Sequence, residues 1–199
     1  MQIIGITGGI GSGKSFIAQT LAQRGFSVYD CDREAKRIIA EDKDVQAAII
    51  KLLGEEAFVN GEYNTAYVAQ RVFAEPELLA ALNKIVHPAV LKDLKALKDS
   101  KDLLVVESAI LFEAGLDKLC DKIIIVEAPE EVRIARTIAR DYQGVATPEN
   151  INKVRARIRA QKKTPASTEA LQGKILTIVN DGSSVLSSII DRICHFTVG

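Results

Sequence analysis

Residues 5 to 16 read GITGGIGSGKSF, a stretch in which glycine occupies five of nine consecutive positions. Glycine offers no side chain to pack and loses more backbone entropy on folding than any other residue. The function of such a stretch must therefore depend on its backbone conformation. The spacing of Gly8, Gly13, Lys14 and Ser15 fits the pattern G-x-x-x-x-G-K-[ST]. In loops of this pattern backbone N–H groups surround phosphates, the lysine adds positive charge and the hydroxyl ligates Mg²⁺. The stretch therefore predicts a phosphate-binding loop (P-loop).

The residues on either side of the loop supply the context that such a loop needs. Residues 1–7 are mostly apolar and β-branched, which predicts a strand, and apolar residues recur at helical spacing from Phe16 until Gly25. A turn that binds no ligand is the alternative, but such a turn rarely needs a lysine and a hydroxyl in register. We expect the loop to bind a nucleotide through Gly9, Ile10, Gly11, Ser12, Gly13, Lys14 and Ser15.

The composition is that of an ordinary globular protein. The 199 residues are 47% hydrophobic, and 26 basic residues balance 26 acidic ones. The longest apolar runs, such as residues 123–126, fall far short of the ~20 residues that a membrane helix needs, and no cationic signal region precedes the first strand. We expect a cytoplasmic protein that does not enter a membrane. Three widely spaced cysteines support neither a disulfide framework nor a zinc site.

Alternating strand and helix patterns predict the fold. Runs typical of strands occupy residues 1–7, 27–32, 102–108, 121–128 and 174–181, with helical periodicity between them. Runs such as LLVV and IIIV are typical of parallel strands buried on both faces, so we predict a doubly wound α/β fold with a five-stranded parallel sheet, as in P-loop NTPases. Within one domain spanning residues 1–199, we interpret residues 33–100 as a helical substrate-binding insert and residues 140–165 as a helical lid.

The charges are unevenly distributed. Residues 133–163 contain nine basic residues against two acidic ones. Tyr142 is the sole aromatic residue in this segment, so a polyphosphate nucleotide is a more economical target than a nucleic acid. Arg133, Arg136 and Arg140 share one helical face, which could be a solvated face or a set of phosphate ligands. Arg140 is our candidate for a lid arginine, and we expect Arg133 to matter less.

A carboxylate is the second requirement of a small-molecule kinase, because the acceptor hydroxyl must be oriented or deprotonated. The guanine-reading pattern N-K-x-D of switch GTPases is absent. Asp30 and Asp32 are expected to end the second strand with both side chains on one side, at the sheet edge where open α/β sheets bind ligands. Asp32 is the candidate base, and an N-cap of the following helix is its alternative role.

The chain as a whole resembles the dephospho-CoA kinases, through TGGIGSGKS, VYDCD, VFAEP, LNKIVHP, ILFEAGLD, RTIARD and IVNDGS. The resemblance implies transfer of the γ-phosphoryl group of ATP, with Mg²⁺, to the ribose 3′-hydroxyl of dephospho-CoA, the last step of coenzyme A synthesis. It also implies Asp32 as the base, with Lys14 and Arg140 as further catalytic residues, Asn180 on the adenine side of ATP and Ser15 as the metal ligand. The substrate-binding set that it implies is Thr7, Asp32, Lys36, His87 and Leu111.

Several positions depart from the family pattern. Phe16 and Ala109 replace a threonine and a proline, while Lys36 and Thr65 replace arginines. Because lysine cannot reproduce a bidentate arginine, we expect the substrate contacts to be redistributed within the insert. His87 precedes a proline and could be structural rather than a ligand. The partners expected are ATP and dephospho-CoA, without nucleic acid or membrane, for a monomer or weak homo-oligomer.

Two other functions stay open from the sequence. The chain could be another P-loop kinase acting on a nucleoside, a nucleotide or a small alcohol. It could also be a non-catalytic ATP-binding switch whose lid reports the nucleotide state to a partner. Turnover with a panel of acceptors separates these possibilities.

Overall fold

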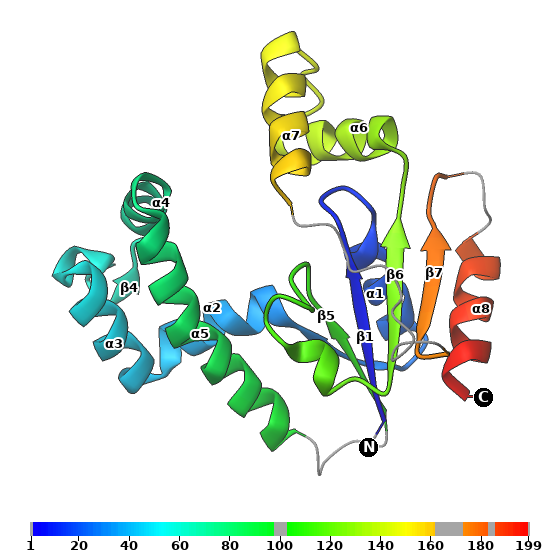
Figure 1. Cartoon of the computed structure of the whole chain (residues 1–199), viewed down its shortest axis with the longest axis horizontal. Coiled ribbons are helices and arrows are strands. Elements are labelled where there is room, and N and C mark those ends of the chain that lie inside the picture. The colour runs from blue at the N-terminus through cyan, green and yellow to red at the C-terminus, as the bar shows by residue number, and fades with distance from the viewer. Residues whose placement is uncertain (1, 98–102, 162–172, 183–185, 199) are drawn as a thin grey trace. The chain divides into compact units, whose positions relative to one another are not determined.

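The computed structural model describes residues 2–97, 103–161, 173–182 and 186–198 (Figure 1). The chain divides into two compact units, one formed by residues 1–29 and 101–199 and the other by residues 30–100. The functional assignment of an insert and a lid from the sequence stays a prediction. The last residues of the predicted lid, 162–165, lie outside the described residues.

The first unit is organised by a sheet of five strands in the order β2-β5-β1-β6-β7. The pairs β1–β5, β1–β6 and β6–β7 are parallel, and Ile4 of β1 lies opposite Val105 and Lys122. The α/β fold with a five-stranded sheet is thus confirmed. The strands are β1 (Gln2–Gly8), β2 (Ser27–Asp30), β5 (Leu103–Glu107), β6 (Lys122–Glu127) and β7 (Ile175–Val179).

Helices α1 (Lys14–Gln23) and α8 (Leu186–Val198) share a hydrophobic core with the sheet (Figure 1). Ile17 and Leu21 of α1 are completely buried there, together with Ile190 of α8. Burying a side chain of this size stabilises a fold by roughly 1.5–3 kcal/mol. The unbroken burial of β1 from Ile3 onward explains why its sequence is continuously apolar instead of alternating.

Two helices form a pair after β6. They are α6 (Glu130–Asp141) and α7 (Pro148–Ala160), and they pack through a small core of Ile134, Ile138, Val154 and Ile158. The hydroxyl of Thr147 caps α7 by accepting a hydrogen bond from the N–H of Asn150 at 3.2 Å. A short 3₁₀ turn, η2 (Leu116–Lys118), precedes β6.

The second unit is mainly helical. Its helices are α2 (Cys31–Glu41), α3 (Lys43–Leu53), α4 (Thr65–Ala74) and α5 (Pro76–Ala96). Arg37 of α2 forms ion pairs with Glu34 and Glu41 on its own helix and with Asp93 of α5, at 2.7 to 3.1 Å. Hydrogen bonds to these carboxylates raise the pKa of Arg37. The network therefore ties the first helix of the unit to the last.

A short hairpin interrupts the helices of this unit. The sequence analysis did not predict this hairpin. After the 3₁₀ turn η1 (Glu55–Ala57), β3 (Phe58–Val59) pairs with β4 (Glu62–Tyr63) in an antiparallel ladder. The turn residues Asn60 and Gly61 have φ values of 53° and 83°. Asn-Gly is the pair that tight hairpins favour, since both turn positions need a positive φ.

The end of β2 differs from the sequence prediction. The strand stops at Asp30, and Asp32 lies in the first turn of α2. The carboxylate of Asp30 accepts hydrogen bonds from the N–H groups of Asp32 and Arg33, each at 3.0 Å. The prediction that the strand reaches Asp32 was wrong, as was the alternative that Asp32 is the cap. The physical reason is that a helix leaves its first N–H groups open, and Asp30 is placed to satisfy two of them.

Within the described residues, no helix has the length and apolar character to cross a membrane. Cys31, Cys120 and Cys194 are free thiols. Burial raises the pKa of the Cys120 thiol to about 12, so this group stays protonated and unreactive at neutral pH.

The Asp30 cap leads to a stability prediction. Asp30→Ala leaves two N–H groups at the start of α2 without their acceptor, so we expect the free energy of unfolding to fall by about 1 kcal/mol. Asp32→Asn, the matched control, keeps the cap and should cost less than half of that. Urea unfolding measures both variants. An equal or larger loss in Asp32→Asn would contradict this assignment of the cap.

Candidate functional site

A buried carboxylate lies beside the P-loop. Glu107 ends β5 and is 5% exposed. Its Oε1 lies 3.4 Å from Nζ of Lys14 and accepts a hydrogen bond from Oγ of Ser15 at 3.2 Å. A carboxylate that is removed from water is tolerated where a cation and hydrogen-bond donors compensate its charge, as they do here. The lysine and the hydroxyl that define the loop motif therefore converge on one acidic side chain.

The sequence analysis did not identify Glu107 as a candidate site residue, although its position in the sequence indicates one. Glu107 directly follows the apolar run LLVV, and a polar residue at the end of a buried parallel strand lies at the carboxyl edge of the sheet. That edge is where open α/β sheets bind their ligands. Glu107 thus joins the candidate site on the strength of its position and its partners.

Two features of the structure explain why the loop contains glycine at these positions. Gly11 and Gly13 have φ values of 75° and 91°, a left-handed conformation that side chains disfavour. A Cβ atom on Gly11 would also overlap the carbonyl oxygen of Arg133, and one on Gly9 would overlap the guanidinium group of Arg133. The start of α6 therefore packs directly on the backbone of the loop.

Two arginines of α6 hold the loop through its carbonyl groups. Nε of Arg133 donates to the carbonyl oxygen of Ile10 at 2.8 Å, and Nη1 of Arg136 donates to that of Ser12 at 3.2 Å. Burial lowers the pKa of Arg133. From the sequence we expected Arg133 to matter less than Arg140, and that expectation stays a prediction. The structure adds that Arg133 contacts the loop directly.

Asn180 follows β7 and lies against the same loop. Its Nδ2 donates to the carbonyl oxygen of Ser12 at 2.9 Å, and its own carbonyl oxygen accepts a hydrogen bond from Arg136 at 2.9 Å. Its backbone N–H donates to the carbonyl oxygen of Glu127 at the end of β6. The predicted contact of Asn180 with adenine stays a prediction, but the structure does bring this residue together with the predicted ATP-binding loop.

Arg140 occupies a different environment from Arg133 and Arg136. Its side chain is 62% exposed, and its Nε donates to Oδ1 of Asp141 at 2.7 Å. Arg157 of α7 donates to Oδ2 of the same carboxylate at 2.7 Å. Hydrogen bonds from Arg140 and Arg157 lower the pKa of Asp141 to about 2, so Asp141 is ionised at neutral pH. Asp141 thereby links the end of α6 to α7.

The predicted substrate residues fall into both units. Thr7 is buried in β1, and Leu111 is fully buried, with its Cδ2 atom 2.8 Å from where a Cβ on Gly5 would lie. Leu111 is thus a core residue in this structure. Asp32, Lys36 and His87 belong to the second unit, on α2 and α5.

His87 lies within a helix that does not stop at the following proline. Helix α5 continues through Pro88 to Ala96. Partial burial lowers the pKa of His87 from its usual 6.5, so the imidazole is mainly neutral at pH 7. A neutral imidazole could accept or donate one hydrogen bond to a substrate but would bring no charge to a phosphate.

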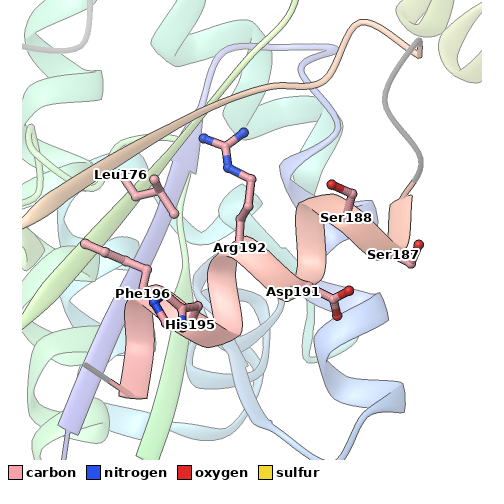
Figure 2. Close-up of a pocket in the computed structure, with 7 residues that line it drawn as sticks. All are labelled: Leu176, Ser187, Ser188, Asp191, Arg192, His195 and Phe196. Carbon is pink, nitrogen blue, oxygen red and sulfur yellow. The ribbon is translucent and has the colours of Figure 1, made fainter.

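A pocket also lies between β7 and α8, apart from the predicted site residues (Figure 2). Leu176 contributes from the strand, and the guanidinium group of Arg192 extends from the helix. None of the residues predicted to bind ATP or substrate lines this pocket. The lining residues are Leu176, Ser187, Ser188, Asp191, Arg192, His195 and Phe196.

The comparison with known families agrees with the geometry of the loop. The family model described as dephospho-CoA kinase matches residues 2–185. The chain belongs to the dephospho-CoA kinase family. Dephospho-CoA kinase of Porphyromonas gingivalis is 36% identical over 195 residues, covering 97% of this chain and 93% of that protein. Dephospho-CoA kinase of Fusobacterium nucleatum is 43% identical over 144 residues, covering 71% and 74%. The expected resemblance is confirmed.

Solved structures give the same fold. The crystal structure of TT1252 from Thermus thermophilus matches with a TM-score of 0.75 and 31% identity, covering 100% of this chain and 98% of that one. Dephospho-CoA kinase from Campylobacter jejuni has a TM-score of 0.64 at 20% identity, covering 100% and 99%. Shikimate kinase from Acinetobacter baumannii has a TM-score of 0.54 at 14% identity, covering 100% and 93%. The last two likenesses concern the fold alone.

The pair of Lys14 and Glu107 leads to a prediction that separates folding from function. Lys14→Ala leaves the buried carboxylate without its cation, so we expect the free energy of unfolding to fall by roughly 2 kcal/mol or more. Lys14→Ala combined with Glu107→Gln should regain most of that loss, because a neutral amide needs no counter-charge.

Urea unfolding and a nucleotide-binding titration check this pair of variants. Neither variant should bind ATP as wild type does, while Lys51→Ala, an exposed lysine on α3, should behave as wild type in both assays. Full ATP affinity in a folded Lys14→Ala variant would remove Lys14 from the site.

Proposed function

We propose that this chain transfers the γ-phosphoryl group of ATP to the ribose 3′-hydroxyl of dephospho-CoA, the last step of coenzyme A synthesis. The observation that carries the proposal is a P-loop whose lysine and hydroxyl meet a buried carboxylate, in a chain of the dephospho-CoA kinase family. In such a reaction the protein contributes chiefly by positioning the two substrates and stabilising the developing negative charge.

The start of α1 supplies the phosphate site in this proposal. Gly13 is the N-cap residue of α1, followed at once by Lys14 and Ser15. The first N–H groups of a helix lack partners within the helix, and the helix dipole favours negative charge at this end. Lys14 adds a full positive charge. The loop is held from its carbonyl side by Arg133 and Arg136, so its shape is set before ATP arrives.

The residues beside the loop fit the Mg²⁺ ion that kinase chemistry implies. The Ser15 hydroxyl and the Glu107 carboxylate are both oxygen donors, which is the ligand type that Mg²⁺ prefers, and their oxygens lie 3.2 Å apart. In the proposal Ser15 ligates the ion and Glu107 orients its surroundings. The bound ion would neutralise part of the phosphate charge.

The remaining roles rest on the resemblance. Asp32 accepts the proton of the 3′-hydroxyl, and Lys36 and His87 contribute to substrate binding. The side chains of Thr7 and Leu111, the other two predicted substrate residues, are buried and would have to become accessible to contact the substrate. Asn180 lies on the adenine side of ATP. Arg140 neutralises charge when the lid closes. Because Arg140 is hydrogen-bonded to Asp141, which is ionised at neutral pH, Arg140 must leave this carboxylate to bind phosphate oxygens. Such exchange is a normal feature of lids that complete a site only after substrate binding.

We further propose that the protein acts in the cytoplasm, as a monomer or weak homo-oligomer, without nucleic acid or membrane as a partner. The basic residues of α6 support one part of this proposal, the absence of a nucleic acid partner, because Arg133 and Arg136 are engaged with the loop and Arg140 with Asp141. They do not form an open basic stripe of the kind that tracks a nucleic acid backbone.

The choice of acceptor gives a direct prediction. Dephospho-CoA should be phosphorylated with a kcat/KM about a hundredfold or more above that of adenosine, AMP or CMP, since the pantetheine and pyrophosphate parts supply binding energy that positions the 3′-hydroxyl. Initial rates at matched concentrations with the four acceptors measure this. A preference for a nucleoside monophosphate would contradict the proposed acceptor and leave another P-loop kinase; ATP binding without any turnover would favour a switch.

Asp32→Asn tests the proton acceptor. The amide keeps the size of the side chain and cannot take the proton, so we expect kcat to fall by about 10²-fold or more while ATP affinity stays unchanged. Because Asp30 is the cap, stability should hardly change. Single-turnover kinetics and an ATP titration check the two effects, with Asp44→Asn on α3 as a control. A rate equal to that of wild type would exclude Asp32 as the base.

A further inference from the structure

The side chain of Gln161 connects the end of α7 to the P-loop. Gln161 is the C-cap residue of α7, and its Oε1 accepts a hydrogen bond from the N–H of Ile10 at 2.7 Å. The same oxygen accepts a second hydrogen bond from Nη2 of Arg133 at 3.2 Å, while Nε of Arg133 donates to the carbonyl oxygen of Ile10. Both polar groups of the Ile10 backbone are therefore held by side chains from outside the loop.

The packing at Gly9 makes this arrangement specific. A Cβ atom on Gly9 would overlap the guanidinium group of Arg133 and lie 3.1 Å from Oε1 of Gln161. Glycine at this position is what allows both side chains to reach Ile10. Three segments that are distant in the sequence, namely the loop, α6 and the end of α7, thus meet at one peptide group.

The chemistry of the amide suits a loop that takes phosphates. An amide oxygen has two lone pairs, and both are used here by Ile10 and Arg133. It provides this acceptor capacity without a negative charge. A carboxylate would make the same hydrogen bonds but would repel a polyphosphate bound at the loop.

We propose that Gln161 is a positioning residue that sets the path of the P-loop at Gly9 to Gly11 and so couples the end of α7 to ATP binding. The proposal rests on the proposed function in one respect, since that function assigns the loop to ATP. If the Ile10 peptide were free to rotate, binding would have to order it, and ATP affinity would fall by that cost.

Gln161→Met is the first test, because it keeps the length of the side chain and removes the acceptor. We expect the Kd of ATP, measured by calorimetry, to rise by about tenfold, the effect of losing one or two hydrogen bonds. The KM of dephospho-CoA should change by less than about twofold, since no acceptor contact is removed. Asn152→Ala, an exposed amide on the same helix, is the matched control and should bind ATP as wild type does.

Gln161→Glu is the second test, because it keeps the acceptor atoms and adds a charge. We expect its melting temperature to equal that of wild type while its ATP affinity is also reduced. A residue that merely stabilised the fold would give the opposite pattern in the first test, because Gln161→Met would lower the melting temperature and leave the Kd of ATP unchanged. That pattern would overturn the proposal.

The two proposals fail separately in these measurements. Calorimetry with ATP needs no acceptor, so the effect of Gln161 is read whether or not transfer occurs. If the wild-type protein binds ATP but does not phosphorylate dephospho-CoA, the proposed function is wrong and the role of Gln161 is still decided by the two variants. If wild type phosphorylates dephospho-CoA and both variants bind ATP as wild type does, the positioning role alone is wrong.

Discussion

The contact between Lys14 and Glu107 is the constraint on which the candidate site depends. A carboxylate buried at the end of β5 requires a cation and a hydrogen-bond donor, and the first two residues of α1 provide both. That requirement fixes where α1 begins relative to the central strands. It also gathers at one sheet edge the positive charge and the oxygen donors that a nucleotide with Mg²⁺ would need.

The shape of the loop depends on the elements packed around it. Arg133, Arg136 and Asn180 contact loop carbonyl groups from α6 and from the end of β7. Arg140 lies farther along the same helical face and pairs with Asp141 instead. One row of arginines therefore divides into residues that hold the loop and a residue that is free to exchange its partner, which is what a closing lid would need.

The sequence predicted much of the fold because its strongest signals are local. Glycine spacing indicated the P-loop, and continuous apolar runs predicted the five strands. The boundary between β2 and α2 at Asp30 was missed because aspartate is common both after strands and at helix N-caps. Glu107 was missed because its partners Lys14 and Ser15 are far away in the sequence. The hairpin at Asn60 and Gly61 had a local signal that could have been used. The spacing of Arg133, Arg136 and Arg140 in the sequence predicted that they share one helical face. Their individual partners depend on how α6 packs, which the spacing does not determine.

In the proposed reaction, this chain phosphorylates the ribose 3′-hydroxyl of dephospho-CoA. Phosphorus NMR of the product formed from dephospho-CoA, ATP and Mg²⁺ detects both the transfer of the phosphoryl group and the hydroxyl that receives it. We expect one new phosphomonoester resonance coupled to the proton on the ribose 3′ carbon, formed in equal amount with ADP. A phosphate on another hydroxyl, or ADP without a phosphorylated acceptor, would exclude this reaction.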